Sequence, residues 1–169
     1  NDDLANDFGN LVQRVLSMIN RNCDARVPEP GVLDAADQAL LDGAHGLADE
    51  LRGHFAVQAF HSALIRLWEV IGAANRYVVE QAPWTLRKTD PARMRTVLYV
   101  LAEAIRHLAI LAQPVTPLGA GQILDQLAVG EGARDIATLG PKGALAPGTP
   151  LPKPEGVFPR FVEAAQATP

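Results

Sequence analysis

A tryptophan that directly follows a proline is the most informative pair in this sequence. Proline cannot be accommodated inside a helix and disfavours helical geometry at the residue before it, so the helix preceding Pro83 should end near Gln81 or Ala82. Trp84 then lies at a corner of the chain, either packed under the fold or presented to solvent. A tryptophan ring on an exposed corner can stack on a planar ligand such as an unpaired nucleobase.

The start of the chain carries a second pair of candidate binding residues. Apolar residues recur at helical spacing over about residues 2–22, which predicts a helix with one buried stripe. Asn10 and Arg14 lie four residues apart, so their side chains should be neighbours on the opposite, solvent-facing side. Asn offers a donor and an acceptor, and Arg offers a rigid fork of donors, which suits a base edge or a phosphate. An ordinary solvated helix face would show the same pair.

Four sequence blocks together resemble the anticodon-binding domain of bacterial methionyl-tRNA synthetases: DLANDFGNLVQRVLSMI, ANRYVVEQAPW, VLYVLAEAIRHLAILAQPVTP and GTPLPKPEGVFPRFVE. The resemblance covers almost the whole chain apart from about residues 26–39. In that family, an Asn and an Arg of the first helix and the Trp after the Pro recognise the CAU anticodon of methionine tRNA. Carried over to this sequence, the resemblance implies these anticodon-binding residues: Asn10, Arg14, Asn75, Pro83 and Trp84.

The resemblance also implies what surrounds such a domain. The chain begins without methionine and inside its first predicted helix, which suggests a piece of a longer enzyme whose catalytic domain comes before it. That domain attaches methionine to tRNA(Met) using ATP, and zinc, if the enzyme has it, belongs there too. We therefore expect no catalytic residue, cofactor or metal site in this chain. Its expected partners are the tRNA(Met) anticodon stem-loop and the catalytic domain, and we expect a monomer.

Catalytic alternatives find little support among the residues. A ferritin-like di-iron site needs Glu-x-x-His pairs on two helices, and none occurs. No nucleophile motif accompanies His45, no phosphate-binding Gly-rich loop precedes a Lys, and both ATP-handling signatures of class I synthetases are absent. Glu103 and His107, spaced by four, are expected to form a surface pair. The sequence thus favours recognition without catalysis.

Two other non-catalytic functions remain open. A helical protein-interaction module would use the acidic balance and the apolar tail, but it has no reason to hold Asn10, Arg14 and Trp84 on one face. The anticodon domain of a sister class I synthetase would share the bundle, although the Ala-Pro-Trp corner weighs against it.

Composition limits how nucleic acid could be bound. A formal net charge of −4 argues against wrapping a large area of nucleic-acid backbone, but not against reading a few bases. Arg87, Lys88, Arg93 and Arg95 cluster after Trp84. The resemblance implies that these cations lie where the backbone of the stem-loop approaches, and a solvated helix start would also explain them.

Cysteine content and hydropathy indicate a compartment. Cys23 is the single cysteine, so neither a disulfide framework nor a cysteine metal cluster is expected. No signal peptide or bilayer-spanning apolar run is present. These features predict a cytoplasmic protein without membrane contact.

The elements that must position these residues are all helical. After the first helix, we expect helices over about residues 33–54 and 55–81, with Gly53 at their junction and Phe60 in the buried stripe. A fourth should start at Asp90 as N-cap with Pro91 following, and a fifth should span about 117–127. The predicted fold is an all-α antiparallel bundle of about five helices over residues 1–128. Residues 129–169 should form an irregular Gly/Pro-rich arm of the same domain that packs back on the bundle.

Two details of that fold are further expectations. Asn75 falls beside the apolar stripe of its helix, so it should be half-buried and should bond backbone groups at the Pro-Trp corner. Phe158, in the arm, should dock on a surface that the catalytic domain helps to complete.

Overall fold

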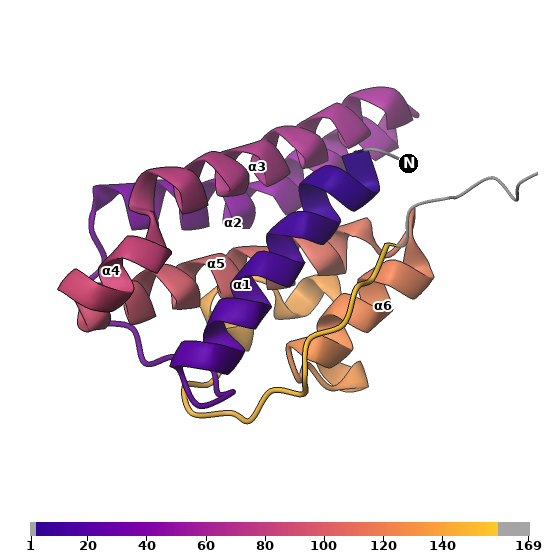
Figure 1. Cartoon of the computed structure of the whole chain (residues 1–169). Helices are drawn as coiled ribbons and strands as arrows, with labels where there is room; N and C mark the ends of the chain where they lie inside the picture. The colour runs from indigo at the N-terminus through magenta and orange to yellow at the C-terminus, as the bar shows by residue number, and fades with distance from the viewer. Residues whose placement is uncertain (1–2, 159–169) are drawn as a thin grey trace, which may run out of the picture.

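The computed structural model describes residues 3–158, which form a bundle of helices (Figure 1). A π-helical segment, η1 (Asp3–Gly9), continues directly into the first α-helix. The α-helices are α1 (Asn10–Asn22), α2 (Ala35–Ala56), α3 (Phe60–Gln81), α4 (Pro83–Thr89), α5 (Pro91–Ala112) and α6 (Pro117–Gln126). The described residues contain no strand, only an isolated bridge between Arg26 and Pro150. The predicted all-α antiparallel bundle is confirmed, and the short helix α4 is an addition that the sequence did not predict.

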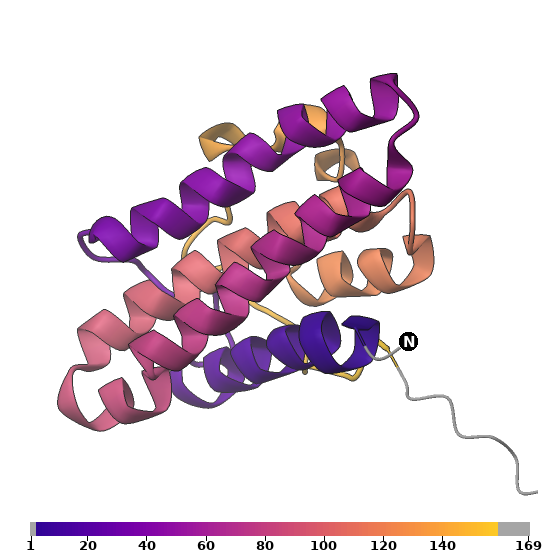
Figure 2. The same ribbon diagram turned by 90° about the horizontal axis from the view of Figure 1, so that it is seen from above.

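Helix α5 forms the centre of the bundle. It contacts each of the other five α-helices, and every residue from Val100 to Ala112 is buried. Figures 1 and 2 show α2 and α3 running side by side, with α1 and α6 packed against other sides of α5. A helix that is covered on all sides is apolar around most of its circumference, as the sequence of α5 is. None of the helices in residues 3–158 combines the length and apolar content needed to cross a bilayer.

The predicted helix ends were correct where local chemistry decides them. Asp90 caps α5 by accepting the backbone N–H of Arg93 at 3.0 Å, and Pro91 is the first helical residue, as expected. The junction of α2 and α3 was predicted wrongly. Gly53 lies inside α2, and the turn follows Ala56, where Gln58 takes a φ of 58°.

The predicted burial of Phe60 was also wrong. Phe60 opens α3 at this turn and is 54% exposed, with its ring 5.5 Å from that of Phe55. A projection of the helix cannot show that no other element covers its first turn.

The arm after α6 runs back along the bundle, beneath α1 and then across α6 (Figure 1). The backbone N–H of Val27 donates to Thr149 O at 2.9 Å, and that of Leu151 donates to Ala25 O at 2.7 Å. The Gln126 amide exchanges two hydrogen bonds with the backbone of Glu155, at 2.8 and 3.1 Å. The arm through residue 158 is therefore irregular in conformation but fastened at several points.

The last described residue of the arm, Phe158, packs on the bundle itself. Its ring centroid lies 6.1 Å from that of Phe8, and its atoms lie against Gly9 and Gly119. Gly119 is the closest approach, because a Cβ built there would lie 2.2 Å from the Phe158 ring. Phe158 is thus docked against Phe8, Gly9 and Gly119, and the expected contribution of a catalytic domain to this surface stays a prediction.

This contact makes a prediction about two glycines of α6. Gly119→Ala should destabilise the protein by about 1 to 3 kcal/mol, because the new methyl group must displace the Phe158 ring. Gly121→Ala is the matched control, since a Cβ there meets nothing within 4 Å. It should be neutral or stabilise by up to about 1 kcal/mol through helix propensity. Urea unfolding measures both, and equal stability of the two variants would contradict the packing.

Candidate nucleic-acid interface

Trp84 stands at an exposed corner between two helices. Helix α3 ends at Gln81, and Ala82 turns the chain with a left-handed backbone (φ 43°, ψ 59°). Pro83 then begins α4 as its first residue and is buried, while Trp84 is 46% exposed. Because Pro83 restricts its own backbone and packs inward, the indole that follows it is presented to solvent.

The first helix meets this corner. Arg14 and Trp84 line one groove of about 270 Å³, together with residues of α1, α3 and α5. Arg14 is exposed on α1, so its guanidinium is available beside the indole. Asn10 is also exposed, one turn nearer the start of α1, but it is not among the residues that line the groove.

Asn75 holds Arg14 in this arrangement. Arg14 Nη2 donates to Asn75 Oδ1 at 2.9 Å, and Asn75 Nδ2 donates to Asp7 O at 3.3 Å and Ile71 O at 3.2 Å. The predicted half-burial of Asn75 is confirmed. Its predicted partners were wrong, because it bonds to η1, to α1 and to the preceding turn of α3, and not to the Pro-Trp corner. Asn75 lies where η1 crosses α3, ahead of the last turns that lead to Pro83.

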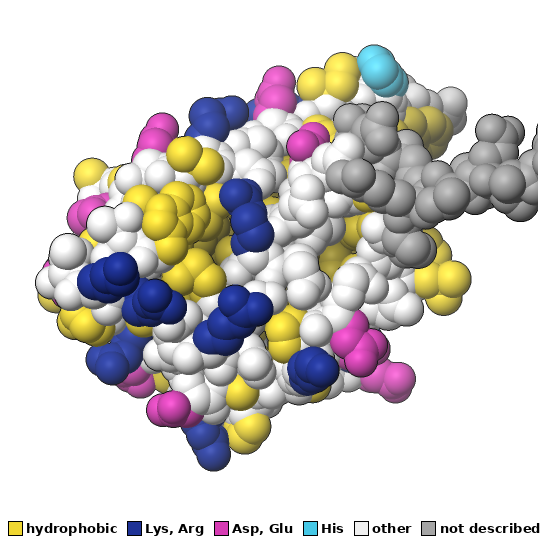
Figure 3. Space-filling model, in the orientation of Figure 1, with side chains coloured by type: hydrophobic (Ala, Val, Ile, Leu, Met, Phe, Trp, Pro, Cys, Tyr) yellow, Lys and Arg dark blue, Asp and Glu magenta, His cyan; other side chains and the backbone are white. Residues whose placement is uncertain are grey.

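Several cations on α1, α3, α4 and α5 lack acidic partners. Figure 3 shows Lys and Arg side chains gathered around exposed hydrophobic side chains over α1 and α4. The cations of these helices that make no hydrogen bond or ion pair within the described residues are Arg21, Arg76, Arg87, Lys88 and Arg95. Arg21 also lines the groove. These cations are free to meet phosphate groups.

Arg93 departs from the expected basic cluster. Its guanidinium forms ion pairs with Asp37 at 2.5 Å and Asp34 at 2.8 Å, and its side chain is only 19% exposed. It is thus a structural residue at the start of α5. The Asp34-x-x-Asp37 spacing, which forms a capping box on α2, is the sequence signal for this cluster.

Comparison with known proteins decides the family. Residues 27–168 match a family model described as the anticodon binding domain of methionyl tRNA ligase. The chain belongs to this family. This anticodon-binding domain is 52% identical over 165 residues to the methionine–tRNA ligase of Mycobacterium tuberculosis strain H37Rv, covering 95% of this chain and 31% of that protein. The Brucella suis enzyme is 51% identical over 164 residues, covering 97% and 32%.

Solved structures agree with the sequence comparison. The apo form of Mycobacterium tuberculosis methionyl-tRNA synthetase superposes with a TM-score of 0.92 at 51% identity, covering 96% of this chain and 33% of that one. The same enzyme with methionyl-adenylate gives a TM-score of 0.90 at 52% identity, covering 94% and 31%. The chain thus spans about a third of the length of the relatives it matches.

A second polar cluster of the anticodon-binding domain lies inside α5. Glu103 and His107 are both buried, so the expected surface pair was wrong. Arg106 donates to Glu103 at 2.6 Å and to the arm carbonyls of Thr138 at 3.1 Å and Gly140 at 3.3 Å. The arm covers this face of α5, which helical spacing alone could not reveal. The sequence signal was that Glu103, Arg106 and His107 lie on adjacent turns within residues 97–112, a stretch of α5 that is otherwise almost entirely apolar.

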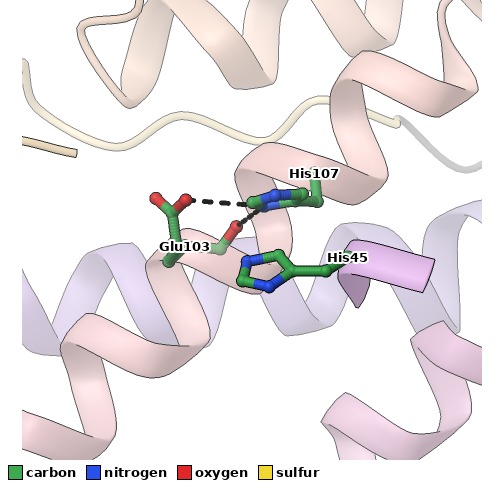
Figure 4. A group of neighbouring side chains, drawn as sticks. All are labelled: His45, Glu103 and His107. Carbon is green, nitrogen blue, oxygen red and sulfur yellow. Dashed lines mark hydrogen bonds and ion pairs between the residues drawn. The ribbon is translucent and has the colours of Figure 1, made fainter. Parts of the chain in front are cut away.

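This cluster fastens the arm to α5 through bonds that occupy most of its potential ligand atoms. Figure 4 shows His45 beside Glu103 and His107, and their potential ligand atoms lie within 4.8 Å of one another. Both ring nitrogens of His107 are occupied, because Nδ1 bonds Glu103 O at 2.9 Å and Nε2 accepts from Gly140 N at 2.8 Å. Glu103 is occupied by Arg106, whose positive charge opposes a bound cation. Within residues 3–158, His45 is the one member of this group whose ring nitrogens make no hydrogen bond.

The burial of His107 predicts a pH dependence of stability. Burial lowers the pKa of His107 from 6.5 to about 4, with Glu103, Arg106 and His45 as its charged or titratable neighbours. The unfolded chain therefore takes up the proton first as the pH falls. About 3 kcal/mol of unfolding free energy, present above pH 6.5, should be lost between pH 6.5 and about pH 4. Urea unfolding at several pH values measures this loss, and His107→Gln should flatten the slope in that window. An unchanged slope in His107→Gln would contradict the assignment.

Proposed function

We propose that this chain is the anticodon-reading domain of a methionine–tRNA ligase and that it binds the CAU anticodon loop of tRNA(Met). The observation that carries the proposal is the single groove that Arg14 and Trp84 line together. It joins a flat apolar ring to a fork of hydrogen-bond donors, which is the combination needed to hold and to identify an unpaired base. Family membership supports the same reading.

The aromatic ring and the polar side chains of the site have different roles. A base splayed from the loop stacks on Trp84, and this stacking accepts any base because every base has a flat face. Arg14 uses one N–H on Asn75 Oδ1, which leaves other donors for a base edge. Asn10, one turn away on α1, adds an amide that both donates and accepts. Selectivity for CAU is therefore assigned to Asn10 and Arg14, and affinity mainly to Trp84.

The unpaired cations supply contacts to the RNA backbone. Arg21, Arg87 and Lys88 are exposed and carry no acidic partner within the described residues. They provide local positive charge on a chain whose formal net charge is −4. Binding should therefore weaken with salt, by a slope of about 0.7 for each phosphate contact.

The rest of the ligase is the second proposed partner. It performs methionine activation with ATP and transfer to tRNA, holds any zinc, and acts in the cytoplasm as a monomer. A groove of about 350 Å³ along the first half of α3 is lined mainly by apolar side chains, including Leu64, Trp68 and Val115. The indole N–H of Trp68 is buried there without an acceptor among residues 3–158. This apolar surface is suited to contact with another protein domain, and it lies at the other end of α3 from Trp84.

The test compares a CAU anticodon stem-loop with one altered at a single anticodon base. Arg14→Ala and Asn10→Ala should each weaken binding of the CAU stem-loop by about 1 to 3 kcal/mol per lost bidentate base contact, and should reduce discrimination. Both side chains are exposed, so helicity and melting temperature should barely change. Arg52→Ala on α2, which removes an exposed ion pair with Asp49, is the control and should leave binding unchanged. Unaltered discrimination in both α1 variants, or their unfolding, would refute the assignment.

A further inference from the structure

A buried carboxylate joins three helices directly behind the Trp84 corner. Asp37, in the first turn of α2, is fully buried. It accepts the Tyr77 hydroxyl from α3, two guanidinium N–H groups of Arg93 from α5 at 2.5 and 2.8 Å, and the Asp34 backbone N–H at 2.9 Å. Burial raises the pKa of Asp37, but the bonds from Arg93 and Tyr77 outweigh this and hold it below its ordinary value. The carboxylate is thus charged and saturated with donors.

Arg93 extends this junction to the corner itself. Its Nη2 also donates to Gln81 Oε1 at 2.7 Å. Gln81 is the last residue of α3, and Arg93 lies in the first turn of α5. The chain between them is residues 82–92, which contains the Ala82 turn, α4 and Trp84. The Gln81–Arg93 bond therefore ties together the two ends of the segment that presents the indole.

This segment needs such a tie for two reasons. Ala82 holds a left-handed backbone with a φ of 43°, a conformation that is strained for a residue with a side chain. Helix α4 has only 7 residues, which is too short for a helix to be stable without support from its surroundings. Local bonds help, since Ala82 O accepts from Thr85 N at 2.8 Å and Leu86 N at 3.2 Å. Helix α4 also packs against α5, and the Gln81–Arg93 bond adds a directional polar contact where the segment leaves α3.

We infer that Gln81 and Arg93 are positioning residues for anticodon reading: their hydrogen bond, anchored on buried Asp37, holds the Ala82–Pro83 corner so that the Trp84 ring faces the groove beside Arg14. The expected effect on binding of the anticodon stem-loop rests on the proposed function, whereas the expected position of the Trp84 ring does not. Gln81 is the residue to change, because its loss leaves the Asp37–Arg93 ion pair intact. Arg93 and Asp37 also stabilise the fold, so their removal would mix two effects.

Gln81→Met removes the acceptor while keeping the length of the side chain, and Gln81→Glu restores an acceptor for Arg93. Gln38→Met is the matched control, because Gln38 donates to Asp42 at 2.9 Å on the exposed face of α2. Each change is made with Trp68→Phe, so that Trp84 is the single tryptophan. Two quantities are measured: iodide quenching of Trp84 fluorescence without RNA, and the Kd for the CAU anticodon stem-loop.

Gln81→Met should change the quenching of Trp84 and raise the Kd by about threefold to tenfold, the loss expected from one hydrogen bond. Gln81→Glu should restore both, and Gln38→Met should alter neither. Combined with Trp84→Ala, Gln81→Met should raise the Kd no further, because it acts through the ring. Unchanged quenching in Gln81→Met would overturn the inference. It would also be overturned if Gln81→Met raised the Kd of the Trp84→Ala variant by as much as it raises the Kd of the domain that keeps Trp84. If the unchanged domain fails to bind the stem-loop, the proposed function falls, and the quenching result alone decides the positioning role.

Discussion

Trp84→Ala should weaken the binding of every anticodon stem-loop, matched or altered, by about 1 to 3 kcal/mol. The reason is that the ring is 46% exposed beside Arg14 and offers a stacking surface that does not distinguish bases. Trp84→Phe should restore part of the loss, because phenylalanine keeps a smaller flat face. Fluorescence anisotropy with labelled CAU and single-base-altered stem-loops measures the set.

The other tryptophan provides the control for this experiment. Trp68 lines the apolar groove on the first half of α3, away from the Trp84 corner, so Trp68→Phe should leave RNA binding unchanged. The melting temperature of Trp84→Ala should stay close to that of the unchanged protein, since Trp84 is 46% exposed and lies outside the buried core. If only the CAU stem-loop lost affinity, Trp84 would be reading a base edge, contrary to the stacking role.

Arg106→Met should destabilise the domain by about 3 to 5 kcal/mol, the largest effect we expect on folding. The change leaves Glu103 as a buried, uncompensated charge and removes the bonds from Arg106 to Thr138 O and Gly140 O in the arm. Urea unfolding gives the free energy. Limited proteolysis of the arm should show faster cleavage near residues 138–145, because this segment loses two of its hydrogen bonds to α5.

An exposed ion pair with the same spacing provides the control for this prediction. Arg52 and Asp49 are spaced by three on α2, as Arg106 and Glu103 are on α5, but both are exposed. Arg52→Met should therefore cost less than about 1 kcal/mol. Similar losses in the two variants would show that burial does not decide the strength of the Arg106–Glu103 pair.

Features that depend on a few neighbouring residues were predictable from the sequence. Pro83 ended α3, and Asp90 with Pro91 started α5, because proline geometry and N-capping act within one turn of backbone. The apolar spacing over the first twenty-two residues likewise gave the extent of η1 and α1. The candidate binding residues were different. The chemistry and spacing of Trp84, Arg14 and Asn10 made them candidates, but an ordinary solvated surface would show the same residues, and the resemblance to a family decided in their favour.

Contacts between distant segments were decided only by the tertiary structure. Helical spacing shows which residues share a face, but it does not show what covers that face. Glu103 and His107 therefore looked solvent-facing, although the arm encloses them, and Arg93 looked like a free cation, although Asp37 holds it. The same reason applies to the site. That Arg14 and Trp84 share one groove depends on how α1 crosses α3 and α5, an arrangement set by packing of the whole core.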